Sequence, residues 1–203
     1  MLLSIMILTI ATRAAYFERL MAILRPQLTA EVELLVDCDN GEVSIGAKRQ
    51  RLLQQATGEY VCFIDDDDLV PEDYVEATLA ALVSRPDCVG WKMHRLCDGV
   101  FEREQIKSLR YRDTRSTQPE FEPPDQLSPI RREIARKVGF LNLNRGEDTA
   151  YSDRVQKFLK IEVFLDRVMY TYEYRTFRGK EVTNASRVPP PRGIGFVCQA
   201  LQM

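Results

Sequence analysis

Short apolar runs and amphipathic segments alternate along the first part of the chain. Residues 3–10 are almost wholly aliphatic, which predicts a strand buried on both faces. Residues 13–24 place their apolar side chains on one helical stripe and stop before Pro26, which predicts a helix. A second apolar run, residues 32–36, ends in the sequence 37–41 (Asp-Cys-Asp-Asn-Gly), which is typical of a turn.

The same alternation continues to about residue 84. Ser44 is a good N-cap for a helix that runs to about residue 56, with Gly58 placed where a left-handed residue would follow the helix. Residues 60–64 form a third apolar run, and Pro71 with two following acids predicts the start of another helix. This order predicts an α/β fold with a Rossmann-type parallel sheet and helices on both faces. Ligands of such sheets bind outside the carboxyl ends of the strands.

The second half is less regular. Asp98-Gly99 predicts a hairpin between residues 89–96 and 100–109. Residues 112–126 are polar and proline-bearing, so we interpret them as a long loop and a candidate lid. A helix is expected from Ser128 to Gly139, another after Asp148, and a strand over residues 168–175 that aligns three tyrosines on one face.

Length and composition favour one domain with a sizeable core. The chain has 203 residues, 45% of them apolar, and we expect a domain over residues 1–188 and a tail over 189–203. Within that domain, we expect two halves, residues 1–88 and residues 89–188. The formal net charge of -2 gives no global basic field for nucleic acid or anionic membranes.

The cysteines and the hydropathy pattern indicate the cellular compartment in which the protein is expected. The five cysteines are odd in number and include no Cys-x-x-Cys pair, which disfavours a disulfide framework and a zinc knuckle and fits a reducing cytoplasm. Residues 2–11 lack the basic leader of a signal peptide. No later stretch approaches the ~20 apolar residues of a membrane span. We therefore expect a cytoplasmic protein without a membrane segment.

Four consecutive carboxylates, Asp65 to Asp68, follow the third apolar run. Like charges this close repel by up to ~4 kcal/mol per pair at an effective dielectric near 20, so a cation is expected among them. If strand geometry continues, Asp65 and Asp67 project to one side and Asp66 and Asp68 to the other. Mg²⁺ or Mn²⁺ is typically bound by one or two carboxylates together with substrate phosphates and water.

Two plainer interpretations of this acidic run remain. One is a solvated acidic loop. The other is a calcium loop, which the sequence disfavours because Val70 occupies the position where that motif requires glycine. Neither explains why the run follows a strand at the same expected sheet edge as Asp37 and Asp39.

Residues 56–68 (Ala-Thr-Gly-Glu-Tyr-Val-Cys-Phe-Ile and the four aspartates) resemble the signature strand and Asp-x-Asp motif of the family 2 glycosyltransferases of the GT-A fold. The resemblance covers about residues 3–84 and again 146–155. It implies that residues 1–88 form the nucleotide-sugar-binding half and residues 89–188 the acceptor-binding half. It implies a metal site at Asp65 and Asp67 and nucleotide-sugar contacts from Thr12, Arg13, Asp37, Asp39, Lys48, Asp65, Asp66 and Glu147. The choice between Asp37 and Asp39 as the acid that contacts the base stays open, and Arg49 lies beside Lys48 where the family often places basic residues.

Gly146-Glu147-Asp148 resembles the family's Glu-Asp pair, which implies that Asp148 is the general base of inverting transfer. Acids near a helix start are also favourable without any catalysis. The chain lacks the Gln-x-x-Arg-Trp motif of the family's processive polymerases after this pair, so single transfer is expected. The resemblance thus implies a non-processive, Mn²⁺- or Mg²⁺-dependent enzyme that uses a nucleotide sugar, most simply a UDP-sugar.

The acceptor stays open at this stage. Residues 129–135 more loosely resemble small glycosyltransferase-like proteins of phages and bacteria, which raises transfer to a hydroxylated DNA base as an alternative. A cationic cluster consists of Arg131, Arg132, Arg136 and Lys137, although a solvated face is its commoner explanation. A nucleotidyltransferase and an inactive nucleotide-binding module are further alternatives. The single histidine, His94, is best interpreted as a strand residue rather than a metal ligand.

Overall fold

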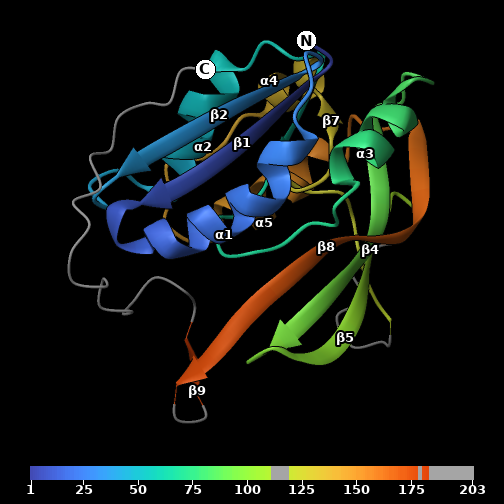
Figure 1. Cartoon of the computed structure of the whole chain (residues 1–203). Helices are drawn as coiled ribbons and strands as arrows, with labels where there is room; N and C mark the ends of the chain where they lie inside the picture. Colours follow the sequence, from blue (N-terminus) through green and yellow to red (C-terminus); the bar gives the residue numbers. More distant parts are fainter. Residues whose placement is uncertain (111–118, 178–179, 183–203) are drawn as a thin grey trace.

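Three parallel strands from the first part of the chain form one half of a mixed sheet in this computed structural model, which describes residues 1–110, 119–177 and 180–182. The strand order is β2-β1-β3-β7-β4-β5-β6, with β8 paired to β4 and β9 paired to β8 (Figure 1). The elements are β1 (Leu3–Ile10), η1 (Ala11–Arg13), α1 (Ala14–Leu24), η2 (Arg25–Gln27), β2 (Val32–Asp39), α2 (Ile45–Gln55), β3 (Tyr60–Phe63), α3 (Tyr74–Leu82), β4 (Cys88–Cys97), β5 (Val100–Lys107), β6 (Glu120–Glu122), β7 (Ile130–Arg131), α4 (Arg132–Val138), α5 (Glu147–Val155), β8 (Glu162–Phe177) and β9 (Lys180–Val182).

Helices cover both faces of this sheet, as the alternation of elements predicted. Leu3, Ile5 and Ile7 of β1 point to one face and pack in a core with residues of α1 and α3. Met6 of β1 points to the other face and packs with residues of α2, α4 and α5. Because successive strand residues alternate between faces, the aliphatic β1 serves both cores at once. The expected α/β fold is therefore confirmed.

Local signals placed several element ends correctly. Ser44 is the N-cap of α2, and its hydroxyl accepts a hydrogen bond from the backbone N of Ala47 at 3.2 Å. The expected turn at residues 37–41 begins too early, because β2 continues to Asp39 in register with β1. The helix expected at Pro71 starts at Tyr74, after a turn in which Pro71 accepts a hydrogen bond from the backbone N of Tyr74.

Gly58 was expected to be a left-handed residue after α2, and this expectation is wrong. The positive-φ glycines among the described residues are Gly41, Gly99, Gly139 and Gly146. Gly58 is required for another reason: a Cβ at this position would lie 2.6 Å from the backbone N of Ser4. Its N–H donates to the Ser4 hydroxyl at 2.8 Å, so the glycine lets the chain pass close to the start of β1.

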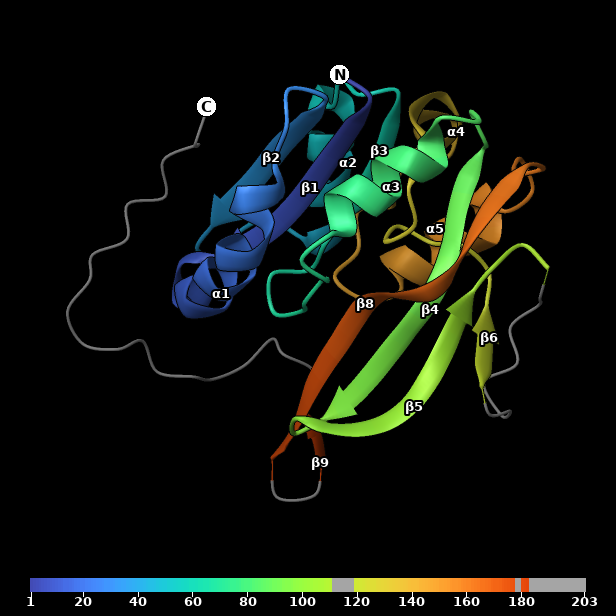
Figure 2. The same cartoon turned by 45° about the vertical axis from the view of Figure 1, so that its right-hand side comes forward.

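The second half extends the sheet away from the helices. β4 and β5 form the expected hairpin, whose turn residues Asp98 and Gly99 both have positive φ. β8 is 16 residues long, twice the length expected, and pairs in parallel with β4 from Glu162 to Tyr174. The β4, β5 and β8 ribbons project together beyond the helical part (Figure 2). The thiols of Cys62, Cys88 and Cys97 are free.

Two short strands were not expected. β6 lies within the segment that we interpreted as a lid loop and pairs with β5, while β7 lies between β3 and β4 where a helix was expected to begin. Residues 112–118 of the expected lid and the tail 189–203 lie outside the described residues. In the part of the chain that the structure describes, no helix has the length and apolar character needed to cross a membrane.

Candidate active site

The carboxyl ends of β1, β2 and β3 lie side by side and bring several polar side chains together. Ile10 and Asp39 are register partners at the ends of β1 and β2, and β3 pairs with β1 as far as Phe63. The acidic run follows β3 directly, and the Thr9 hydroxyl donates to Asp66 Oδ2 at 2.6 Å. The first strand and the acidic run therefore share one edge of the sheet, where open α/β sheets bind their ligands.

The guanidinium of Arg13 joins two of the four acids. Its Nη2 lies 2.6 Å from Asp66 Oδ1 and 2.6 Å from Asp67 Oδ1, and its Nε donates to Asp66 Oδ2 at 3.1 Å. Burial raises the pKa of Asp66 to about 6 even though Arg13 and Thr9 oppose the rise. Burial also raises the pKa of Asp67, and the nearby charge of Asp65 adds to this rise. Asp66 and Asp67 thus share the guanidinium of Arg13.

The fourth acid, Asp68, points away from this cluster. Its carboxylate is buried and accepts hydrogen bonds from the Tyr170 hydroxyl at 2.8 Å and from the backbone N of Glu173 at 3.0 Å. The expected alternation of the four acids is therefore wrong, since Asp66 and Asp67 share Arg13. The reason is that β3 ends at Phe63 and the chain turns at residues 66–67.

Two basic residues of α2 face the acids of β2. The buried Nζ of Lys48 donates to the backbone O of Thr9 at 2.6 Å and to Asp39 Oδ1 at 2.7 Å. Arg51 binds both oxygens of Asp37, at 2.6 and 2.7 Å. Asp39 thus lies on the side of β1 and Lys48, whereas both carboxylate oxygens of Asp37 are engaged by Arg51. Both oxygens of Asp39 are engaged as well, because the backbone N of Gly41 donates to Oδ1 at 3.1 Å and the backbone N of Val43 donates to Oδ2 at 3.0 Å.

Arg49 connects the acidic run to the Glu-Asp pair. Its Nη2 lies 3.1 Å from Asp65 Oδ1, and its Nε lies 3.3 Å from Glu147 Oε1. Burial opposes the charged guanidinium, but Asp65, Glu147 and Asp148 together raise the pKa of Arg49. Its Nη1 is buried and has no hydrogen-bond partner among the described residues. Arg49 is therefore a cation that faces three acids from two distant parts of the sequence.

The start of α2 positions these cations through a close backbone contact. Gly46 donates its N–H to the backbone O of Leu143 at 2.9 Å, and a Cβ at Gly46 would lie 1.8 Å from the backbone O of Leu141. We expect Gly46→Ala to lower the free energy of unfolding by about 1–3 kcal/mol through overpacking. Urea denaturation checks this prediction. Gly41→Ala is the matched control, because nothing lies within 4 Å of its added Cβ and only its positive φ opposes the change.

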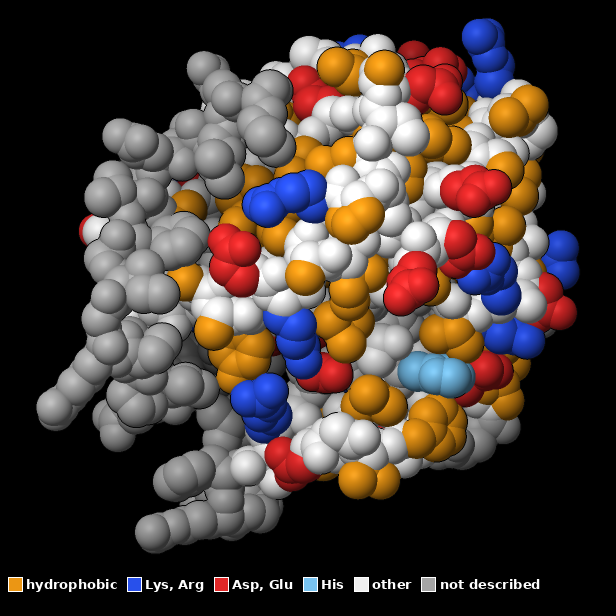
Figure 3. Space-filling model, viewed as in Figure 1, with side chains coloured by type: hydrophobic (Ala, Val, Ile, Leu, Met, Phe, Trp, Pro, Cys, Tyr) orange, Lys and Arg blue, Asp and Glu red, His pale blue; other side chains and the backbone are white. Residues whose placement is uncertain are grey.

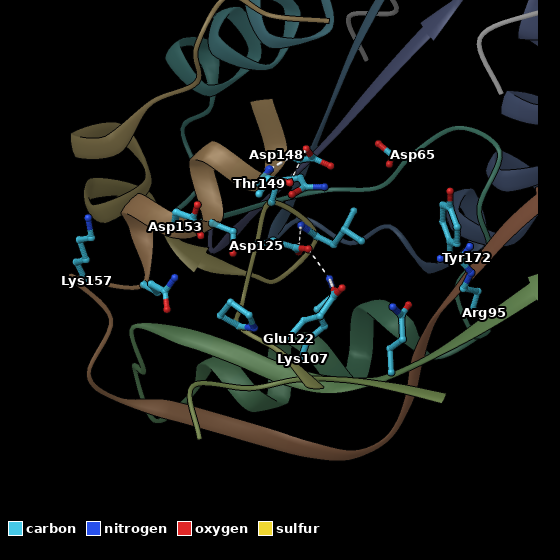
Figure 4. A pocket seen from close by; sticks show the side chains of 16 residues that line it. Asp65, Arg95, Lys107, Glu122, Asp125, Asp148, Thr149, Asp153, Lys157 and Tyr172 are labelled. Carbon is cyan, nitrogen blue, oxygen red and sulfur yellow. Dashed lines mark hydrogen bonds and ion pairs between the residues drawn. The ribbon is translucent and has the colours of Figure 1, made fainter. Parts of the chain in front are cut away.

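A cavity of about 760 Å³ opens beside the acidic run. Asp65 and Asp148 both line it, and Figure 4 shows them on the same side of the cavity, Asp148 at the start of α5. Asp148 accepts a hydrogen bond from the backbone N of Thr149 at 2.7 Å. Its neighbour Glu147 is buried against Arg49, so the two acids of the pair have different environments. Thr12, also predicted for this site, is an exposed residue of η1.

A sequence model of Glycosyl transferase family 2 matches residues 35–139, just over half of the chain. The chain belongs to glycosyltransferase family 2. A search of curated proteins finds no match to it. The matched span of this family 2 chain includes Lys48, Arg49 and the whole acidic run.

Solved structures resemble the family 2 chain across most of its length. TarS of S. aureus, residues 1–349 in complex with UDP, superposes with a TM-score of 0.67 at 18% identity, over 85% of this chain and 60% of that one. The same protein in complex with UDP-GlcNAc gives 0.67 at 17% identity, over 92% and 62%. The mannosyltransferase PcManGT from Pyrobaculum calidifontis, in complex with GDP-Man and Mn²⁺, gives 0.55 at 15% identity, over 83% and 56%. The family 2 chain spans 37% of the longer TarS chain.

The acidic run fits a divalent cation that is bound together with a diphosphate. The Asp65 side chain is 33% exposed and lines the cavity, and its charge raises the pKa of the more buried Asp67. No group of three His, Cys, Asp or Glu side chains arranged for a metal is present within the described ranges. Two carboxylates completed by phosphates and water are a usual set for Mg²⁺ or Mn²⁺. Asp65 and Asp67 would therefore be its protein ligands.

The cavity residues that the sequence analysis did not predict come mostly from the second half of the chain. Lys107, Glu122, Asp125 and Gln126 line the cavity wall opposite α5. Three of these four lie in the segment 112–126, whose polarity and prolines were the signal for a functional loop. Lys107 ends β5, and its position gave no such signal.

The cationic cluster has structural partners in this family 2 chain. Arg131 donates to the backbone O of Pro86, Arg132 to that of Ala56, and Arg136 to those of Leu53, Gln54 and Ala56. Lys137 lies over the ring of Phe158. Arg132 and Arg136 thus satisfy carbonyl groups at the end of α2, whereas Arg131 satisfies one that follows α3. On the part of the surface described in Figure 3, acidic and basic side chains are interspersed rather than gathered in a basic stripe.

His94 is a partly exposed residue of β4, as interpreted from the sequence. Its Nε2 lies 3.9 Å from Glu104, and its ring contacts Phe101 edge to face. The tyrosines of β8 have separate roles. Tyr170 is buried and donates to Asp68, whereas Tyr172 lines the cavity. Although the sequence pattern placed these tyrosines on one face, Tyr170 is a structural residue and Tyr172 is a cavity residue.

Proposed function

We propose that this family 2 chain transfers a sugar from a nucleotide diphosphate sugar, most simply a UDP-sugar, to an acceptor hydroxyl in one inverting, non-processive step. The observation that carries the proposal is that Asp65 and Asp148, from two distant segments, line one cavity at the carboxyl edge of the sheet. The comparison structures add support, because TarS is solved with UDP and UDP-GlcNAc and PcManGT with GDP-Man and Mn²⁺.

The nucleotide would bind along the ends of β1 and β2. Asp39 and Lys48 lie there together, beside the exposed Thr12, and are proposed to contact the base and ribose. Arg13 and Arg49 flank the acidic run on opposite sides. We assign them to orient the Asp65–Asp67 carboxylates. The unpartnered Nη1 of Arg49 is one donor that the diphosphate would satisfy.

Asp148 is proposed as the general base. As the acceptor oxygen forms a bond to the anomeric carbon, the bond from that carbon to the diphosphate oxygen breaks, and the acceptor proton passes to the Asp148 carboxylate. Glu147 stays paired with Arg49 and fixes the start of α5. A divalent cation at Asp65 and Asp67 would supply positive charge to the departing diphosphate. An in-line attack from the Asp148 side inverts the anomeric configuration.

A donor screen tests this function. The chain is incubated with a panel of UDP-, GDP- and dTDP-sugars, with Mn²⁺ or with a chelator, and released nucleoside diphosphate is measured. We expect release from at least one donor, and we expect the chelator to abolish it, because two carboxylates alone repel a diphosphate. A parallel incubation with UTP and a sugar 1-phosphate that released pyrophosphate would instead identify a nucleotidyltransferase. Nucleotide binding without release from any donor would identify an inactive module.

A further inference from the structure

The strand β8 lies against the acidic run and holds its last residues. Leu69, which follows the run, exchanges two backbone hydrogen bonds with Thr171 of β8, at 3.0 and 2.8 Å. The backbone N of Glu173 donates to Asp68 Oδ1 at 3.0 Å. Tyr172, between these two residues of β8, lines the cavity (Figure 4). The position of the acidic run therefore depends on a strand that lies far along the sequence.

One hydroxyl group joins the first and the last acid of the run. The Tyr170 hydroxyl accepts a hydrogen bond from the backbone N of Asp65 at 3.0 Å and donates one to Asp68 Oδ2 at 2.8 Å. The tyrosine is 0% exposed, so both bonds are made inside the protein. Because a phenol has one proton to donate, the hydroxyl donates to one partner and accepts from the other. The two ends of the run are thus held at a fixed separation.

Asp65 is the acid of the run whose side chain is least enclosed. The other three acids are buried, whereas the Asp65 side chain is 33% exposed. Its cationic contact is Arg49 Nη2, at 3.1 Å. Mg²⁺ requires its oxygen ligands close to ideal octahedral positions, so a small displacement of one carboxylate weakens binding. A support for the backbone of this residue would therefore affect the affinity for the cation.

We propose that Tyr170 is a positioning residue of the metal site, whose hydroxyl holds the backbone of Asp65 where the carboxylate can reach the cation. Tyr170 is not among the described residues that line the cavity, so its effect passes through Asp65. Without the hydroxyl, the N–H of Asp65 would lose its acceptor, and a shift of the backbone toward water would compensate for the loss. The proposal rests on the proposed function for the cation, and it adds a residue that touches neither the cation nor the substrates.

Mn²⁺ binding measured by electron paramagnetic resonance tests this role, because the signal of the free ion falls as the ion binds. The full chain is titrated with Mn²⁺ in excess UDP, and Tyr170→Phe is compared with Tyr60→Phe. Tyr60, at the start of β3, is also 0% exposed and donates to the backbone O of Pro86 at 2.7 Å. Both variants thus lose one buried hydroxyl, and their melting temperatures should fall by similar amounts. We expect the Kd of Mn²⁺ to rise about tenfold in Tyr170→Phe and by less than about twofold in Tyr60→Phe.

Asp68→Asn separates the two bonds of the hydroxyl. The bond from Asp65 to Tyr170 remains in this variant, so we expect its affinity for Mn²⁺ to stay within about threefold of the unmodified chain. Unchanged affinity in Tyr170→Phe, or an equal loss in Tyr60→Phe, overturns the proposal. A tenfold loss in Asp68→Asn also overturns it, because the contact to Asp68 would then be the one that matters.

Amide hydrogen exchange on the unmodified chain gives a test that needs no variant. We expect the N–H of Asp65 to exchange slowly before Mn²⁺ and UDP are added, because Tyr170 already holds it. Exchange at the rate of an exposed amide overturns the proposal, even if Tyr170→Phe does not fold. Absence of Mn²⁺ binding by the unmodified chain would overturn the metal site and this role together, whereas unchanged binding in Tyr170→Phe overturns this role alone.

Discussion

Asp148→Asn should lower turnover of the nucleotide sugar by about 10²- to 10⁴-fold while leaving affinity for UDP within about twofold, as expected when a general base is removed. The reason lies in its position: Asp148 lines the cavity next to Asp65, but only its neighbour Glu147 binds Arg49. An amide at this position keeps the shape of the side chain and its acceptor oxygen for the backbone N of Thr149. The negative charge is lost, and with it the capacity to take a proton.

Steady-state kinetics with the donor found in the screen, combined with calorimetry for UDP, measure both quantities. Asp166→Asn is the control, since Asp166 is 77% exposed, pairs with Lys92 and does not line the cavity. Unchanged turnover in Asp148→Asn would show that Asp148 is not the general base. A parallel loss of UDP affinity would show instead that Asp148 acts in donor binding.

Asp65→Asn should weaken Mn²⁺-dependent UDP binding at least tenfold, whereas Asp68→Asn should change it by less than about threefold. Asp65 is partly exposed and lines the cavity, so its charge is available to a cation. Asp68 is buried between Tyr170 and the backbone of Glu173. Burial, together with the charges of Asp65 and Asp67, raises the pKa of Asp68 well above its usual range. Replacing a carboxyl that already resists ionisation removes little charge.

Asp65→Asn and Asp68→Asn can be compared directly because both variants replace a carboxylate of the same acidic run by an amide. Titration calorimetry of UDP with Mn²⁺ on each variant gives the two affinities, and thermal denaturation confirms that each is folded. Equal losses in both variants would indicate that the acids act only through the general charge of the loop. A larger loss in Asp68→Asn would place the metal on the other side of the run.

Local sequence signals were sufficient to predict much of the first half of the chain. The largely aliphatic run of β1 has the predicted bounds, and its two polar residues, Ser4 and Thr9, are buried with it. Ser44 and Asp98-Gly99 specify a cap and a turn through their own backbone and side-chain preferences. The acidic run was correctly placed at the sheet edge for the same reason, since it follows an apolar strand directly.

Long-range pairing explains what the sequence could not predict. The orientation of the four acids depends on Arg13 and Tyr170, which lie far away in the chain and supply opposite attractions to Asp66 and Asp68. β7 has two residues and exists only because β3 and β4 offer edges on both sides. The polar cavity wall around Gln126 forms only when β5 and α5 come close together in the fold. No local sequence pattern predicts that these two elements lie near each other.

We propose above all that the acidic run binds a nucleoside diphosphate through a divalent cation. Calorimetric titration of UDP into the unmodified chain, once with Mn²⁺ and once with a chelator, tests it most directly. We expect saturable binding of UDP with Mn²⁺, and we expect the chelator to abolish it. Absence of binding at millimolar UDP with Mn²⁺, or equal binding in the chelator, would contradict it.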